Sequence, residues 1–252
     1  MNIQMIGGAK KALVKAYNRS KRFIGLKRKH NGIGLVNYPK SSKKYLKQSF
    51  SQQGEDLSLD RIWSRVLNNK FIQKGFYVDM GSYHPIEHSV TYLMYLRGWK
   101  GLVIDASKKS CELHKIERPR DIVINAVVGE HDMESVNFYY SKSNQLSLIN
   151  TKYPSSKNKY NKVSLPQKNI NTILKSKGIN TIDFLNIDIE GAELEVLETL
   201  NFDKYKPKII AVEIHGNDIA KGLNTDIAKK LLEMNYILLA VNVITYFFCR
   251  SN

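Results

Sequence analysis

Five times along the chain, a short apolar run that contains or ends in a polar residue is followed by a helical pattern. Such alternation predicts an α/β domain in which a parallel, doubly wound sheet carries helices on both faces. Ligands of such sheets bind at the carboxyl ends of the strands. The expected strands are 76–81, 101–105, 122–128, 182–188 and 209–214. The expected helices are 52–67, 89–97, 108–115, 170–177, 192–200 and 226–233.

The remaining segments predict smaller features. Residues 135–140 predict a strand of a hairpin arm, and residues 141–168, rich in Ser, Asn, Lys and Tyr, predict a long loop. Two apolar runs, 236–241 and 245–249, predict antiparallel neighbours near the end of the chain. We therefore expect a mostly parallel sheet with a C-terminal antiparallel strand.

Basic residues are concentrated at the N-terminus. Of 39 Lys and Arg residues, 13 lie in residues 1–50, which contain no Asp or Glu, whereas the other 202 residues carry 26 basic and 23 acidic groups. The charge of +16 therefore belongs largely to one segment and not to the body of the protein. We predict a basic amphipathic arm and linker over residues 1–49 and one globular domain over residues 50–252.

The arm has a helical stripe. Ile6, Leu13, Tyr17 and Ile24 recur at helical spacing, and most of the neighbouring Lys and Arg residues lie off that stripe. Such a helix can lie on an anionic membrane surface, although a solvated arm, an acidic partner and a transit peptide remain alternatives. No run of 18 apolar residues occurs, and the two cysteines lack metal-ligand spacing. We therefore expect a cytoplasmic protein. If the arm binds a membrane, the contact is expected to be peripheral and at the inner face.

Polar residues mark the ends of the expected strands. Four of the five are carboxylates, and helix capping explains any one of them more easily than all of them. These residues are Asp79, Asp105, Asn125, Asp188 and Glu213.

Asp79 and Asp105, at the first two expected strands, indicate a class of cofactor. The chain has neither the Gly-x-Gly-x-x-Gly fingerprint nor a phosphate-binding loop, so a pyrophosphate cradle is not expected. Asp79 and Gly81 suit a ligand with a cationic amino group, and Asp105, 26 residues after Asp79, can accept both hydroxyls of a ribose. S-adenosylmethionine combines these two features and carries no phosphate.

Longer motifs strengthen this interpretation. Residues 75–85 (GFYVDMGSYHP), 89–91 (SVT) and 97–105 (RGWKGLVID) resemble an FkbM-type methyltransferase, as do 51–57 (SQQGEDL) and 183–193 (DFLNIDIEGAE). The resemblance covers about residues 50–250 and implies a class I, Rossmann-like methyltransferase fold. It also implies S-adenosylmethionine as cofactor and O-methylation of a saccharide or another small hydroxylated molecule. The expected cofactor-binding residues are Asp79, Gly81, Ser82, Asp105, Ala106, Asn125 and Asp188; Ala106 replaces the proline that is common in such sequences.

Methylation of a hydroxyl needs help with proton loss, either from a general base or from a metal ion. Asp188 and Glu213 should face each other across the cleft, and with His215 they could hold Mg²⁺ or another divalent cation. This arrangement is similar to that of metal-dependent catechol-type O-methyltransferases. In one alternative His215 is a metal-free base; in another His215 only hydrogen-bonds a loop and Glu190 caps the next helix. The candidate catalytic residues are Asp188, His215 and Glu190.

Other functions remain as alternatives. Residues 84–88 (HPIEH) match the pattern of inverted zinc peptidases, but Pro85 disfavours the helix which that site requires. Methylation of nucleic acid is another alternative, but the nearly neutral body argues against it, as do residues 186–189 (NIDI), which stand in place of the usual Asp/Asn-Pro-Pro-Tyr/Phe motif. A non-catalytic cofactor-binding module is a third alternative.

In an O-methyltransferase, residues 142–168 would form a lid over the acceptor, with Tyr153 and Tyr160 as stacking rings.

Overall fold

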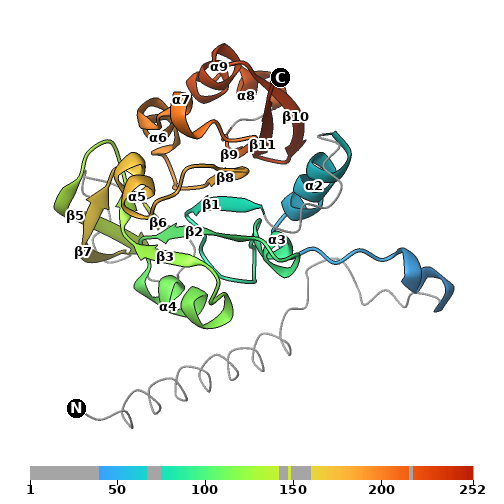
Figure 1. Ribbon diagram of the computed structural model, residues 1–252, viewed down its shortest axis with the longest axis horizontal. Helices are drawn as coiled ribbons and strands as arrows, with labels where there is room; N and C mark the ends of the chain where they lie inside the picture. Colours follow the sequence, from blue (N-terminus) through green and yellow to red (C-terminus); the bar gives the residue numbers. More distant parts are fainter. Residues whose placement is uncertain (1–39, 67–74, 142–146, 149–159, 216–217, 252) are drawn as a thin grey trace, which may run out of the picture. The chain divides into compact units, whose positions relative to one another are not determined.

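The computed structural model describes residues 40–66, 75–141, 147–148, 160–215 and 218–251, and it divides into two units after Gln48. The described part of the first unit contains the 3₁₀ helix η1 (Lys40–Tyr45) within the expected linker. The predicted amphipathic helix lies outside the described residues. The second unit, Ser49–Asn252, contains the sheets and the candidate site (Figure 1).

The main sheet has seven strands in the order β10-β11-β9-β8-β1-β2-β3. Strand β1 pairs in parallel with β2 on one side and with β8 on the other, so the strand order reverses at β1. Crevices at such reversals are the usual ligand sites of open α/β sheets. The bounds are β1 (Phe76–Met80), β2 (Lys100–Asp105), β3 (Ile122–Asn125), β8 (Phe184–Ile187), β9 (Ile209–Glu213), β10 (Tyr236–Asn242) and β11 (Thr245–Arg250).

The last two strands confirm the expected C-terminal arrangement. Strand β11 runs antiparallel to both β9 and β10, with Tyr246 opposite Val212 and Val241. The other pairings of the seven-stranded sheet are parallel. The predicted α/β class, with a mostly parallel sheet and a C-terminal antiparallel strand, is therefore confirmed.

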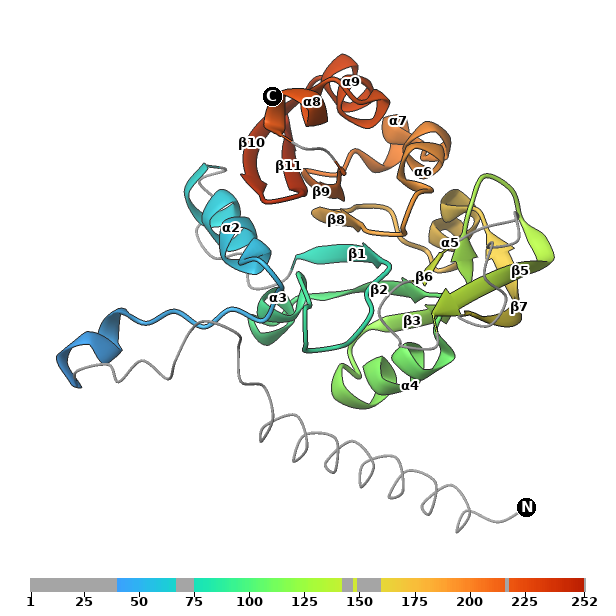
Figure 2. The ribbon, with the colours of Figure 1, turned by 180° about the vertical axis from the view of Figure 1, so that it is seen from behind.

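Each central strand buries both of its faces. In β1, Val78 and Met80 belong to one hydrophobic cluster, whereas Tyr77 belongs to the cluster on the opposite face. Helices α5, α6 and α9 contribute to the first cluster, and α2, α3 and the π-helical turn η2 to the second, so the sheet is covered on both sides (Figures 1 and 2). The helices are α2 (Glu55–Arg61), η2 (Ile62–Val66), α3 (Tyr92–Leu96), α4 (Lys108–Glu117), α5 (Ile170–Ser176), α6 (Glu193–Thr199), α7 (Phe202–Tyr205), α8 (Ile219–Leu223) and α9 (Asp226–Glu233).

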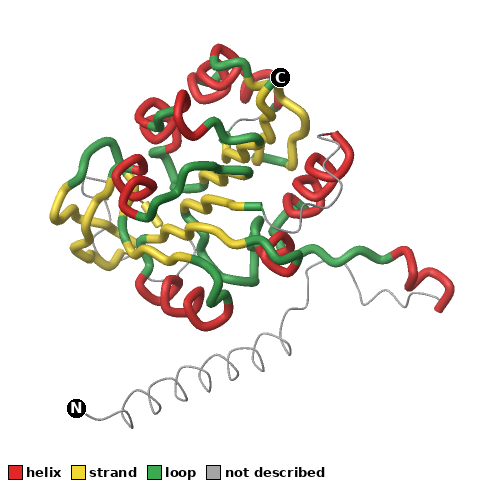
Figure 3. The backbone as a smooth tube through the Cα atoms, in the orientation of Figure 1, coloured by secondary structure: helices red, strands yellow, loops and turns green. Residues whose placement is uncertain are grey.

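A second, four-stranded sheet corrects two predictions (Figure 3). The apolar run 122–128 does not form one strand: β3 ends at Asn125, and the chain then enters the second sheet as β4. The predicted loop 141–168 is wrong over residues 160–168, which form β7, and over the short β6. The strands are β4 (Val127–Val128), β5 (Met133–Ser141), β6 (Ser147–Leu148) and β7 (Tyr160–Lys168), in the order β4-β7-β5-β6.

The reason for the second error lies in the composition of β7. Leu165 is buried and Val163 partly buried, whereas Lys162 and Ser164 point to solvent. That alternation is typical of a strand with one wet face, but few of its residues are strongly apolar. The predicted hairpin arm is present, because β5 pairs antiparallel with β7 along most of its length.

The structure also bears on membrane insertion. Across the described ranges, no helix combines the length and the apolar character needed to cross a bilayer.

Candidate functional site

The ends of β1 and β8 meet at Gly81. This residue has φ +78°, and a Cβ built on it would lie 1.6 Å from the carbonyl oxygen of Asp188. Only glycine avoids both the left-handed strain and this collision. Gly81 therefore allows the two loops that follow β1 and β8 to approach closely.

Asp79 lies beneath this junction. It is 2% exposed; one carboxylate oxygen accepts a 2.5 Å hydrogen bond from Thr91 Oγ1, and the other accepts one of 3.0 Å from Asn186 Nδ2. These bonds connect β1 to β8 and to the segment before α3. The structure thus gives Asp79 a supporting position, and its direct contact with the cofactor's amino group stays a prediction.

Asp105 is the last residue of β2, and its carboxylate accepts two hydrogen bonds from backbone N–H groups. The N–H groups of Tyr83 and Ser107 lie 2.8 and 2.6 Å from its carboxylate oxygens. Burial raises the pKa of Asp105 to about 6, and these hydrogen bonds oppose the shift. Nearby, Ser82 is 6% exposed and its Oγ is buried without a hydrogen-bond partner.

The predicted adenosine rim lies on the turn after β2. Asn125 Nδ2 donates 2.9 Å hydrogen bonds to the carbonyls of Asp105 and Ala106. Ala106 packs against a small cluster that includes Phe138 and Leu165. Asn125 therefore holds the turn that positions Asp105, while its contact with cofactor remains predicted.

Three carboxylates gather where β8 and β9 end. Asp188, Glu190 and Glu213 each offer one oxygen, and these oxygens lie within 4.8 Å of one another. Burial raises the pKa of Asp188, and two effects of Glu213 raise it further: the hydrogen bond that protonated Asp188 donates to it and the negative charge of its carboxylate. Burial and Glu213 also raise the pKa of Glu190. Such grouping of like charges is typical of functional sites and of cation sites.

The loop after β8 directs Glu190 toward this group. Glu190 has φ +59°, which is uncommon for a residue with a side chain. The buried Glu193 holds the loop, because its carboxylate accepts the N–H groups of Ile189 and Gly191 at 3.1 and 2.9 Å. Helix α6 begins after Ala192 without a side-chain cap hydrogen bond, so Glu190 does not cap it and the helix-capping alternative is wrong.

The histidines differ in position. The side chain of His215 is 71% exposed, and its Nε2 lies 3.8 Å from Glu213 Oε1. It does not belong to the carboxylate group, so its role as ligand or base stays a prediction. His84 accepts the N–H groups of Ile86 and Glu87 in a loop, not on a helix, so the zinc peptidase geometry is not formed.

Arg118 is a residue that the sequence did not single out. It is 0% exposed and pairs with Asp121 at 2.7 Å. Its guanidinium also donates to Tyr77 Oη at 2.6 Å and to Thr91 Oγ1 at 3.0 Å. Through Thr91 it supports Asp79, so one buried cation connects β1 to the loop before α3.

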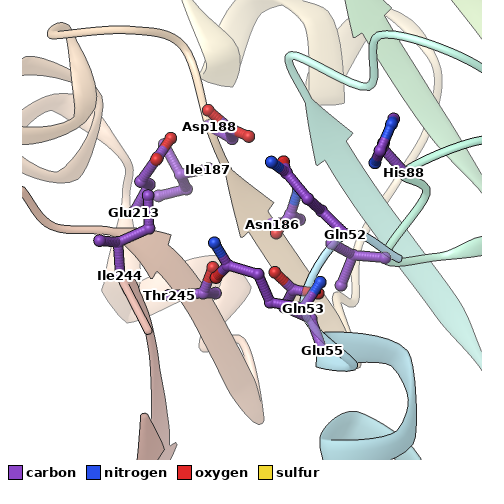
Figure 4. Close-up of a pocket in the computed structure, with 11 residues that line it drawn as sticks. Gln52, Gln53, Glu55, His88, Asn186, Ile187, Asp188, Glu213, Ile244 and Thr245 are labelled. Carbon is purple, nitrogen blue, oxygen red and sulfur yellow. The ribbon is translucent and has the colours of Figure 1, made fainter. Parts of the chain in front are cut away.

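A polar pocket opens beside the carboxylates (Figure 4). Asn186, Asp188 and Glu213 line it from the strand ends, and His88 lines it from the loop after β1. Gln52, Gln53 and Glu55 close it from the segment that begins α2, and Ile244 and Thr245 from the β10–β11 turn. Of the predicted lid, residues 142–146 and 149–159, with Tyr153, lie outside the described residues, and Tyr160 begins β7.

One protein family and several solved structures are similar to this chain. The Methyltransferase FkbM domain family matches residues 79–238. Seven solved chains match, among them a TehB-like SAM-dependent methyltransferase from Corynebacterium glutamicum ATCC 13032 Kitasato, at 11% identity and a TM-score of 0.38 over 94% of this chain and 99% of that one. No curated protein matches. Because the family covers well over half of the chain, the protein belongs to the FkbM methyltransferase domain family, whose members depend on S-adenosylmethionine.

Proposed function

We propose that this protein transfers a methyl group from S-adenosylmethionine to a hydroxyl of a saccharide or another small hydroxylated molecule, assisted by Mg²⁺ or another divalent cation. The observation that carries the proposal is the group of Asp188, Glu190 and Glu213 beside a polar pocket at the strand ends. A hydroxyl acceptor must lose its proton during methyl transfer, and nearby carboxylates can assist that loss.

The residues on the β1 and β2 side fit the cofactor. Asp105 retains acceptor capacity for two ribose hydroxyls after it has accepted two backbone N–H groups. Ser82 Oγ, buried without a partner, can bond to a polar group of the ligand. When bound, S-adenosylmethionine supplies an electrophilic methyl group on a sulfonium.

The carboxylates fit a hard divalent cation. Mg²⁺ and Ca²⁺ prefer oxygen ligands, and three carboxylate oxygens within 4.8 Å of one another can share one ion. A bound cation would lower the pKa of the acceptor hydroxyl. With or without it, Asp188 and Glu213 of this group line the pocket, where a hydroxyl proton must be accepted.

Cation binding gives a test that needs no acceptor. Titration of the protein with Mn²⁺, followed by electron paramagnetic resonance, should show a site that is lost in Asp188→Asn and in Glu213→Gln. Asp203→Asn, an exposed acid on α7, is the matched control and should bind as the wild type does. Equal Mn²⁺ binding in all four proteins would contradict the cation site.

Transfer itself is tested by formation of S-adenosylhomocysteine in the presence of methyl glycosides. The proposal predicts acceptor-dependent turnover that EDTA suppresses and Mg²⁺ restores. Turnover that EDTA leaves unchanged would favour the metal-free alternative, and a preference for RNA or DNA as acceptor would overturn the saccharide assignment.

A further inference from the structure

The segment that enters α2 is held in place by a buried carboxylate. Asp56 is 0% exposed and accepts hydrogen bonds from Ser49 Oγ at 2.6 Å, from Phe50 N at 2.7 Å and from Ser51 Oγ at 2.9 Å. Because so many donors converge on one residue, the turn before α2 has a defined conformation. This turn forms one wall of the pocket.

Gln53 extends from this turn into the pocket (Figure 4). Its backbone is held on both sides: the N–H donates to Glu55 Oε2 at 2.7 Å, and the carbonyl accepts from Asn242 Nδ2 at 3.2 Å. Its side-chain Oε1, however, is buried and has no hydrogen-bond partner. A buried acceptor without a partner destabilises a protein, so a ligand in the pocket that donates a hydrogen bond to this oxygen would remove that cost.

The charged groups of the pocket are acidic. Glu55, Asp188 and Glu213 line it, and no Lys or Arg is present among the described residues of the lining. A divalent cation at Asp188 and Glu213 would offset part of this charge but would leave Glu55 on the opposite wall. An acceptor that carries a phosphate or a carboxylate near the methylated hydroxyl would be repelled.

We propose that this pocket is the acceptor subsite and that it selects a polyhydroxylated ring that is neutral or carries an amino group. In this arrangement Gln53 Oε1 accepts a hydrogen bond from an acceptor hydroxyl and so acts as a specificity residue. The inference rests on the proposed function, because it places the acceptor next to Asp188, at the junction where the cofactor half of the site begins.

The charge selection is tested with a matched panel: methyl glucoside, methyl glucosaminide, methyl glucuronide and glucose 6-phosphate, each with the full chain, S-adenosylmethionine and Mg²⁺. The expected result is formation of S-adenosylhomocysteine with the first two and at least about tenfold lower kcat/KM with the two anions. Higher kcat/KM with an anion than with its neutral counterpart would overturn the inference, and so would transfer to none of the neutral and amino members.

Gln53→Met tests the hydrogen bond with little change in side-chain volume. We expect KM for the neutral acceptor to rise about tenfold, with little change in kcat or in the Kd for S-adenosylhomocysteine. The variant should unfold at the same denaturant concentration as the wild type or a higher one, since Oε1 has no partner within the protein. A structural role would instead lower stability.

Gln167→Met is the control, because Gln167 lies on β7 and donates to the carbonyl of His131. An unchanged KM in Gln53→Met, or an equal rise in both variants, would overturn the role of Gln53. If S-adenosylhomocysteine fails to bind to the folded wild type, the proposed function fails as a whole; if it binds and anions are preferred, only the acceptor inference fails.

Discussion

At the residue scale, Gly81 is the position where substitution should do most damage. Gly81→Ala would place a methyl group 1.6 Å from the Asp188 carbonyl, so β1 and β8 would have to separate. We expect a loss of about 3 kcal/mol or more in the free energy of unfolding, measured by urea denaturation. Gly178→Ala is the control: it has φ +64° but nothing within 4 Å, so only the left-handed strain of about 1–2 kcal/mol applies. Equal losses in the two variants would contradict the close approach.

Asp105 should make cofactor binding depend on pH. Burial raises its pKa to about 6, so the ionised form that accepts ribose hydroxyls is lost as the pH falls through this value. The affinity for S-adenosylhomocysteine should therefore be nearly constant above pH 7 and about tenfold weaker at pH 5, one unit below the pKa. Calorimetry at several pH values measures this. Asp105→Asn should bind weakly with little pH dependence; a wild-type profile in that variant would contradict the assignment.

Only some residues of the candidate site could be predicted from the sequence. Asp105, Asp188 and Glu213 could be predicted because the carboxyl ends of parallel strands share one edge of a sheet. Gln53 could not be predicted, because its position in the pocket wall depends on a hydrogen bond from Asn242, which lies 189 residues away in the sequence. Glu190 was placed wrongly in one alternative because its left-handed conformation, which turns it toward Asp188, is visible only in the structure.

At the element scale, the loop between β1 and α3 depends on Arg118 from the end of α4. Arg118→Ala leaves Asp121 buried without its partner, and loss of one member of a buried pair costs about 3–5 kcal/mol. We expect this destabilisation in urea, together with weaker binding of S-adenosylhomocysteine, since Thr91 and Asp79 lose support.

A surface ion pair is the control for the buried pair of Arg118 and Asp121. Lys208 lies 2.7 Å from Asp183, but its side chain is 48% exposed. Lys208→Ala should therefore cost less than about 1 kcal/mol. If Arg118→Ala were as mild as Lys208→Ala, the buried network would not be what holds the loop.

The elements themselves followed from the sequence where their pattern was strong. Strands β1, β2 and β9 are apolar on both faces and were predicted nearly to the residue. Strand β7 was missed because its buried side chains alternate with Lys and Ser, and β3 was extended too far because Ala126, Val127 and Val128 continue the apolar run after the chain has left the main sheet. Periodicity does not show at which residue a chain changes sheets.

At the scale of the whole molecule, the uneven charge predicts a separate role for the N-terminal segment. The body carries little net charge, whereas residues 1–50 carry 13 basic groups. The full chain should sediment with vesicles that contain phosphatidylserine and not with phosphatidylcholine vesicles, since each Lys or Arg near an anionic surface contributes about 1 kcal/mol.

Salt provides the check on this prediction. Binding should weaken severalfold when the ionic strength rises from about 0.1 to 0.2 M, because exposed charges are screened. A chain that begins at Ser49 should not sediment with vesicles but should bind S-adenosylhomocysteine unchanged. Vesicle binding by that shorter chain would contradict the role of the arm. Cytoplasmic placement and contact with the inner face of the membrane remain predictions.

We propose that S-adenosylmethionine binds at the ends of β1, β2 and β8 and that Asp105 accepts hydrogen bonds from it. The most direct test of this proposal is calorimetric titration of S-adenosylhomocysteine into the full chain and into Asp105→Asn, with folding checked by circular dichroism. We expect a Kd on the order of micromolar for the wild type and at least about tenfold weaker binding for the variant. No binding by a folded wild type, or equal affinity in the two proteins, would contradict it.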